Sequence, residues 1–132
     1  MSLTIGASAT ISKTISDQDI VRFAEVIGDH NPVHLDETYA AKTMFKRRIA
    51  HGMLCGGLIS AVIGTKLPGP GTIYLNQTLR FTAPVYIGDT VTARVTVAKI
   101  REDKGIVTLE TVCFNQHNKN VVEGEAVVMF RG

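Results

Sequence analysis

The beginning of the chain changes from an alternating to a helical pattern of apolar positions. Residues 3–14 alternate loosely and predict a strand. Ser16 followed by acidic residues is typical of a helix start, because a serine caps the helix and acids favour its positive end. Gly28 favours the end of this helix. The apolar residues of this helix recur at helical spacing, so one face is expected to point toward the core; these residues are Ile20, Phe23, Ala24 and Ile27.

The middle of the chain contains a run, residues 52–63, that is apolar or small on every side. A helix that is apolar all round is a buried helix, so we expect this one at the centre of the fold. A short helix is predicted before it, over residues 36–43. Proline and glycine residues at 67–71 end the central helix and turn the chain.

After residue 71 the apolar pattern becomes alternating, which indicates strands. Further strands are predicted over residues 106–115 and 121–130, with turns rich in Gly, Asp and Asn between them. Helices followed by an antiparallel meander predict an α+β domain over residues 1–132, with the sheet wrapped around the central helix. The first two strand faces are expected to hold Ile73, Leu75, Leu79 and Phe81, with Gln77 as a polar exception, and Val91, Ala93, Val95 and Val97.

Length and charge narrow the classes of partner. The chain has 132 residues, enough to bury a core without disulfides or metal. Its net charge of +2 is too weak to indicate nucleic acid or a membrane as a partner. Cys55 and Cys113 lie in apolar and strand-like runs, which favours buried reduced thiols over a disulfide. We see no signal peptide and no apolar run long enough to span a bilayer, and expect a cytoplasmic protein.

The richest chemistry lies in residues 28–36, Gly-Asp-His-Asn-Pro-Val-His-Leu-Asp. Asp29 and His34 flank Pro32, which does not fit inside a helix, so an acid and an imidazole are held on a short, stiffened segment. On spacing alone, a capping aspartate in a turn and a surface histidine are the more frequent outcome. The functional interpretation is a general acid–base pair that shares one water, typically worth about 10²–10⁴ in rate.

A second cluster, residues 48–54, opens the apolar run with His51 and Gly52. The ordinary interpretation is a hydrogen-bonded core histidine and a glycine at a helix start. The functional one concerns the Gly52 N–H, which has no partner within the helix and no Cβ beside it. Such a group can donate to a substrate oxygen that becomes negative during a reaction.

A metal site would need several ligands, and His30, His34, His51 and Cys55 are present. Pro32 interrupts the helix that would align His30 with His34, and no metal-binding motif occurs, so we expect no metal. A nucleophilic role for Cys55 is disfavoured because no activating charge is adjacent to it in the sequence.

A basic cluster is formed by Lys42, Lys46, Arg47 and Arg48. One interpretation is a solvated face. The other is a landing site for the phosphates of a carrier molecule, since the guanidinium group of arginine matches phosphate geometry.

Residues 28–36 and 48–54, together with the segments at 79–81, 84–85 and 88–89, resemble the MaoC-like hot-dog family. Within that family the chain is similar to the short, single-domain R-specific enoyl-CoA hydratases, over essentially its whole length. The resemblance implies a hot-dog fold, in which a curved antiparallel sheet wraps around one long helix. It also implies a homodimer joined through the sheet edges, with the site near the interface, and no cofactor, because coenzyme A is part of the substrate.

The resemblance further implies roles for individual residues. Asp29 and His34 match the catalytic acid–base pair, and Gly52 matches the backbone donor to the thioester oxygen. Asn31 is expected to shape the turn, and Ser60 on the central helix to lie near the catalytic carboxylate. The acyl tail is expected against medium to bulky side chains, which favours about four to six carbons; these are Ile63, Leu67 and Val128.

The implied reaction is the reversible hydration of trans-2-enoyl-CoA to (3R)-3-hydroxyacyl-CoA, which would suit precursor supply for polyhydroxyalkanoate synthesis. Three alternatives stay open. A dehydratase of acyl-carrier-protein thioesters would use the basic cluster as its docking surface. A thioesterase would release free thiol. A non-catalytic acyl-CoA-binding module would bind the ligand without turnover.

Overall fold

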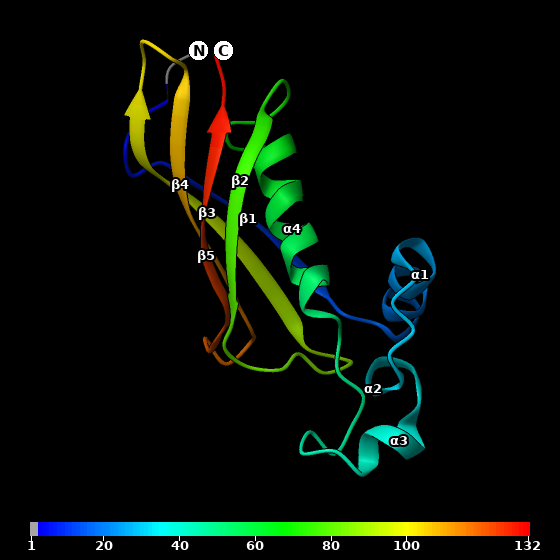
Figure 1. Cartoon of the computed structure of the whole chain (residues 1–132). Coiled ribbons are helices and arrows are strands. Elements are labelled where there is room, and N and C mark those ends of the chain that lie inside the picture. Colours follow the sequence, from blue (N-terminus) through cyan, green and yellow to red (C-terminus); the bar gives the residue numbers. More distant parts are fainter. Residues whose placement is uncertain (1–2) are drawn as a thin grey trace.

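The fold is built on a five-stranded antiparallel sheet that carries a long helix on one face (Figure 1). The structure, a computed structural model, describes residues 3–132. In chain order the elements are β1 (Ser8–Thr14), α1 (Asp17–Ile27), α2 (Pro32–Leu35), α3 (Glu37–Ala41), α4 (Gly52–Thr65), β2 (Ile73–Phe81), β3 (Thr90–Arg101), β4 (Ile106–Phe114) and β5 (Asn120–Met129). The strand order is β1-β3-β4-β5-β2, so β1 and β2 form the two edges. Strands β3, β4 and β5 form a meander as predicted, whereas β2 departs from the prediction because it pairs with β5 and not with β3.

The helix α1 begins and ends as the sequence predicts. The Ser16 hydroxyl and the Asp19 carboxylate form a capping box, and Gly28 ends the helix with a φ of 79°, a conformation that glycine adopts without strain. Ile20 and Ala24 are buried. The expectation for Ile27 is wrong, since 49% of this residue is exposed. The reason is that α1 lies beyond the end of α4 instead of on the sheet (Figure 1).

Between α1 and α4 the chain forms two short helices where the pattern predicts one. Helix α2 begins at Pro32, a position where a missing N–H costs nothing, and the Asn31 side chain caps it by accepting from the Val33 N–H at 3.2 Å. Helix α3 is capped by Asp36, which accepts from the Tyr39 N–H at 3.1 Å. The segment at 28–36 is therefore a helix junction and not an open loop.

The central helix α4 is buried on one face only, which corrects the expectation of burial all round. That face packs on the sheet, while Met53 is 54% exposed and Ser60 is also exposed. One sheet layer can cover only one side of a helix, so the apolar composition of α4 leaves an open face in the single chain. Within residues 3–132, no helix is long and apolar enough to cross a membrane. The buried face consists of Leu54, Cys55, Ile59, Val62 and Ile63.

The strands confirm one predicted face and correct another. The β3 face predicted to be buried is at most 1% exposed at each of its residues. In β2, a bulge between Tyr74 and Asn76 shifts the pairing, so that Tyr74 lies opposite the buried Val128 and Ile73 lies opposite Met129. Directly opposite residues share a face, so Tyr74 and not Ile73 lies on the side of α4.

The two cysteines are free and buried, as predicted. Cys55 belongs to the buried face of α4, and Cys113 lies on the facing strand β4. The Cys113 thiol donates to the Cys55 carbonyl at 3.6 Å, which positions both residues as core groups.

Candidate active site

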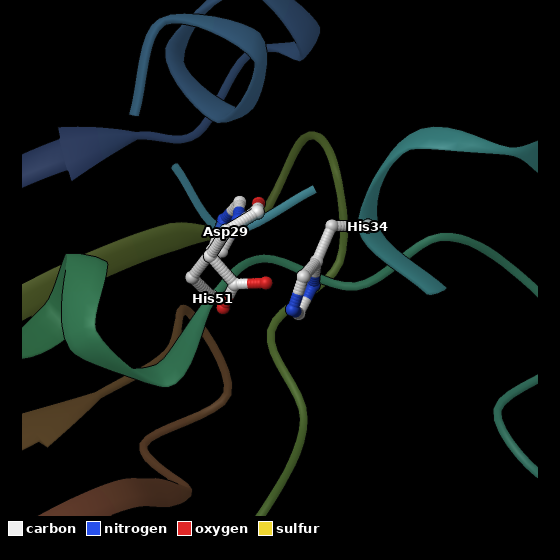
Figure 2. A group of neighbouring side chains, drawn as sticks. All are labelled: Asp29, His34 and His51. Atoms are coloured by element: carbon white, nitrogen blue, oxygen red, sulfur yellow. Dashed lines mark hydrogen bonds between the residues drawn. The ribbon is translucent and has the colours of Figure 1, made fainter. Parts of the chain in front are cut away.

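Asp29, His34 and His51 form one cluster at the junction of the helices (Figure 2). One carboxylate oxygen of Asp29 and one ring nitrogen of each histidine all lie within 4.8 Å of one another. Asp29 lies between α1 and α2, His34 on α2, and His51 directly before α4. The structure therefore brings together the two residues that the sequence pairs, and adds a third.

Asp29 presents an exposed carboxylate from a tight turn. Gly28, in its left-handed conformation, turns the chain out of α1 immediately before it. The backbone N–H of Asn31 donates to Asp29 Oδ1 at 3.1 Å, which is an Asx turn. Within residues 3–132 the other carboxylate oxygen accepts no hydrogen bond, so it is available to a ligand.

His34 is buried and its ring is fixed by a hydrogen bond. Its Nδ1–H donates to the carbonyl oxygen of Ile49 at 2.8 Å, so the neutral ring carries its lone pair on Nε2. Burial lowers the pKa of His34, and the neighbouring His51 adds to this effect, while the Ile49 carbonyl and Asp29 act in the opposite direction. The net pKa is lowered, so the ring is held in the neutral form that can accept a proton.

His51 is the residue of the cluster that sequence reasoning did not place in the site. It is only 2% exposed, and its Nε2–H donates to the Asp29 carbonyl oxygen at 3.0 Å. Its ring stacks on that of His34, with 3.8 Å between centroids. The available signal was its position directly before Gly52, since any arrangement that brings Gly52 to the site also brings His51.

Gly52 is the first residue of α4, so its N–H has no acceptor within the helix. The packing around it is tight. A Cβ at this position would lie 2.5 Å from Cε1 of Phe81, closer than two carbon atoms can approach. A side chain at this position would therefore require the Phe81 ring to move, and the absence of one leaves the N–H accessible.

Arg48 belongs to the support of the site and not to a free basic surface. Its Nε–H donates to the His34 carbonyl oxygen at 2.6 Å, and Nη1 pairs with Asp17 at 2.7 Å. Its backbone N–H donates to Glu37 at 3.2 Å. The side chain of Arg48 thus connects α1 with α2, and its backbone N–H adds a contact with α3.

The other members of the predicted basic cluster are exposed: Lys42, Lys46 and Arg47. The Arg47 guanidinium lies over the Tyr86 ring, 4.1 Å from its centroid. This arrangement leaves Lys42 and Lys46 as the charges that face solvent.

Two largely apolar cavities flank the start of α4. One, of about 540 Å³, is lined by Ile49, Gly52, Met53 and Phe81 among others. The other, of about 570 Å³, lies between α1, α4 and β2, and Ser60 and Tyr74 line it. Met53 lines both cavities, so they adjoin on the open face of the helix.

The residues predicted to line an acyl pocket lie elsewhere. Ile63 and Val128 are in the buried core between α4 and the sheet, and Leu67 packs against that core. None of the three lines either of the two cavities. Their contact with an acyl tail stays a prediction.

Comparison with known proteins gives a consistent result. Residues 4–119 match the model of the MaoC like domain family. The (R)-specific enoyl-CoA hydratase of Rhodospirillum rubrum is 58% identical over 124 residues, which cover 94% of this chain and 85% of that protein. The 3-hydroxybutyryl-CoA dehydratase of Methylorubrum extorquens is 48% identical, covering 96% and 80%. The solved structure of the (R)-hydratase from Aeromonas caviae involved in PHA biosynthesis superposes with a TM-score of 0.95 at 48% identity, covering 98% of each chain.

Proposed function

The chain belongs to the MaoC-like domain family, and on that premise we propose that it is an (R)-specific enoyl-CoA hydratase. It is a hydro-lyase that adds water to trans-2-enoyl-CoA to give (3R)-3-hydroxyacyl-CoA. The observation that carries this conclusion is 58% identity, over 94% of the chain, to a hydratase of that specificity. The predicted α+β hot-dog fold is confirmed by the near-complete superposition on an (R)-hydratase.

The first step of the proposed mechanism is activation of one water by Asp29 and His34. Their polar atoms lie within 4.8 Å. Two hydrogen bonds of about 2.8 Å that meet at a water oxygen span up to about 5.6 Å, so one water can bridge the pair. The free Nε2 lone pair of His34 accepts the proton of that water as its oxygen attacks C3 of the substrate.

The second step concerns the charge that develops on the thioester oxygen. The Gly52 N–H at the positive end of α4 can donate to this oxygen, and the absence of a Cβ lets the substrate approach. A proton then returns to C2 from the same side, so that the elements of one water are added across the double bond. Asp29 and His34 serve as base and then as acid.

The stereochemistry of the product tests this function on the wild-type protein, without any substitution. The product of crotonyl-CoA hydration is offered to dehydrogenases specific for (3R)- or (3S)-3-hydroxybutyryl-CoA. The proposal expects oxidation by the (3R)-specific enzyme alone. Oxidation by the (3S)-specific enzyme would overturn it.

Short acyl chains are the proposed substrates. The Methylorubrum extorquens relative is named for a four-carbon substrate, 3-hydroxybutyryl-CoA, which supports this proposal. We expect kcat/KM to decrease from the four- and six-carbon enoyl-CoA to the eight-carbon one. A higher value for the longer chain would contradict it. The Aeromonas caviae hydratase is involved in PHA biosynthesis, and supply of precursors for that synthesis is the corresponding physiological proposal.

A homodimer is the proposed assembly. Leu75 and Phe81 of the edge strand β2 are exposed, and so is Met53 on the open face of α4. Apolar patches of this kind mark interaction surfaces, and an unpaired strand edge can pair with a second copy. Light scattering after size-exclusion chromatography is expected to give twice the mass of the chain. The variant L75K is expected to shift this mass toward that of one chain.

A dehydratase of acyl-carrier-protein thioesters is the second candidate, and the exposed Lys42 and Lys46 favour it. A carrier protein with an acidic surface would be recognised by such charges. Rates with crotonyl-CoA and with the crotonyl thioester of an acyl carrier protein separate the two. The primary proposal expects higher kcat/KM for the CoA ester, and a small effect of K42A/K46A. Free thiol release, which would indicate a thioesterase, is expected to be absent.

A further inference from the structure

His51 makes contact with both residues of the proposed acid–base pair, through different atoms. Its Nε2–H donates to the backbone carbonyl of Asp29 at 3.0 Å. The face of its ring stacks on His34 at 3.8 Å, with 28° between the ring planes. The rings of Phe23 and His51 meet in a T-shaped arrangement, with 5.1 Å between centroids. Asn31 also contacts both residues, since its N–H donates to Asp29 Oδ1 and its carbonyl accepts from the His34 N–H, but both of these bonds are local to the turn.

The contact with Asp29 is the long-range tie of that turn. The Asp29 side chain accepts a hydrogen bond from the Asn31 N–H, two residues away, which holds the turn only internally. The bond from His51 spans 22 residues of sequence and joins the turn to the start of α4. Without it, local hydrogen bonds through Asn31 still relate Asp29 to His34, but no hydrogen bond among the described residues joins Asp29 to the start of α4.

The ring of His51 makes one polar contact among the described residues. Its Nδ1 atom is buried and has no hydrogen-bond partner within residues 3–132. The hydrogen bond from Nε2 to the Asp29 carbonyl oxygen is therefore the contact that orients the ring.

Resting on the proposed function, we propose that His51 is a positioning residue, which anchors the Asp29 turn by one hydrogen bond and supports the His34 ring by stacking. The two contacts together set where the acid and the base stand relative to each other. The reaction needs this geometry because one water has to reach both groups at once.

The charges around the stacked rings fix the sign of a pH effect. Asp29 faces both histidines, and the guanidinium of Arg48 binds the His34 carbonyl and is itself paired with Asp17. Phe23, from α1, is uncharged. The charge of a protonated His51 lowers the pKa of the His34 ring that is stacked on it. Replacing His51 by an uncharged residue therefore makes His34 easier to protonate.

Two substitutions separate the contacts of His51, and a third serves as a control. H51F keeps a ring for stacking but has no hydrogen-bond donor. H51Q keeps an N–H donor for the Asp29 carbonyl but has no ring. H117Q makes the same chemical change at an exposed histidine in the turn after β4. For each protein, kcat and KM for crotonyl-CoA are measured across pH, and the titration of His34 is followed by NMR with ¹⁵N-labelled histidine.

The proposal expects kcat of H51F to fall by about 10- to 100-fold, because a small misplacement of a catalytic group has that effect. H51Q is expected to recover part of this loss. Both variants should move the acid limb of kcat/KM and the NMR titration of His34 to higher pH, whereas H117Q should match the wild type.

Wild-type kcat in folded H51F, or equal losses in both variants without any shift of the acid limb, would overturn the proposal. If H51F does not fold, the shift of the acid limb and of the His34 titration in H51Q decides whether the proposal holds. The NMR titration does not depend on turnover, so a failure of the hydratase assignment is distinguishable: the wild type would then show no hydration while the His34 shift persists.

Discussion

The Nδ1 atom of His34 lies 2.8 Å from the carbonyl oxygen of Ile49, fifteen residues further along the chain. Together with the Ile49 N–H, which donates to the Val33 carbonyl at 3.2 Å, this hydrogen bond joins α2 to the segment that leads into α4. It also decides which ring nitrogen is free, because a carbonyl oxygen can only accept. The orientation of the proposed base is thus set by the backbone that positions the proposed oxyanion donor, Gly52.

The pH dependence of hydration follows from the lowered pKa of His34. Burial disfavours the charged ring, so the neutral, proton-accepting form persists below the ordinary histidine value of about 6.5. We expect the acid limb of kcat/KM for crotonyl-CoA to lie below that value, with activity rising as pH increases through the limb. An acid limb above the ordinary histidine value would contradict this account of the site.

The same shift has a consequence for stability. Since His34 has a lower pKa in the folded state than in the unfolded one, the unfolded chain binds its proton first as pH falls. The free energy of unfolding therefore decreases as the pH falls from about 6.5, the pKa of His34 in the unfolded chain, to its lower pKa in the folded state. Above this pH range the contribution of His34 to stability is fully present. Urea unfolding of wild type and H34Q across this range measures it, and the wild type should lose more stability on acidification.

The substitution G52A tests the space in front of the Gly52 N–H. The added Cβ keeps the donor but occupies the approach, and it also meets the Phe81 ring at 2.5 Å. We expect kcat/KM to fall by about tenfold or more, less than the roughly 10²–10³ typical of losing a donor outright. The double variant G52A/F81L removes the clash with the ring, so it should regain stability without regaining activity.

A matched control for this substitution exists on the same helix. An added Cβ at Gly64 meets nothing within 4 Å. G64A is expected to raise the free energy of unfolding by up to about 1 kcal/mol, the difference in helix propensity, and to leave kcat unchanged.

Full recovery of activity in G52A/F81L would show that Phe81, and not the substrate approach, explains the effect of G52A.

The substitution R48M tests the support of His34. It removes the hydrogen bond to the His34 carbonyl and the ion pair with Asp17. Loss of a charged hydrogen bond of this kind costs about 1–3 kcal/mol, and we expect a lower kcat as α2 loses its tie. D17N removes only the ion pair with a mostly exposed carboxylate, so its cost should stay below about 1 kcal/mol. Chemical denaturation and crotonyl-CoA kinetics on both variants decide between these expectations, and wild-type behaviour of R48M would contradict them.

The elements that depend on local signals were predictable from the sequence. Ser16 and Gly28 set the ends of α1 because caps act within a few residues. The buried face of β3 was predictable because its apolar residues alternate strictly, so that only one face of the strand can pack against the core. The pairing of Asp29 with His34 needed the family resemblance as well, since their spacing alone is ordinary turn chemistry.

The remaining features depend on contacts between distant parts of the chain. The bulge at Tyr74 is set by pairing with β5, and it moves Ile73 to the outer face against the sequence pattern. One face of α4 stays open because the single chain supplies only one sheet layer to cover it. The apolar composition of the helix does not show how many layers surround it. The stacking of His51 on His34 joins residues 17 positions apart, through a helix junction whose path the pattern does not specify.

The most direct measurement follows the loss of enoyl-thioester ultraviolet absorbance when purified protein is added to crotonyl-CoA, with D29N and H34A measured in parallel. Circular dichroism confirms that the variants fold. The account predicts rapid loss with the wild type, no free thiol, and rates lower by about 10²–10⁴ in either variant. Near-normal turnover in folded D29N or H34A would contradict the proposed acid–base pair. Absence of turnover by the wild type on crotonyl-CoA, on longer enoyl-CoA esters and on acyl-carrier-protein thioesters would contradict the hydratase itself.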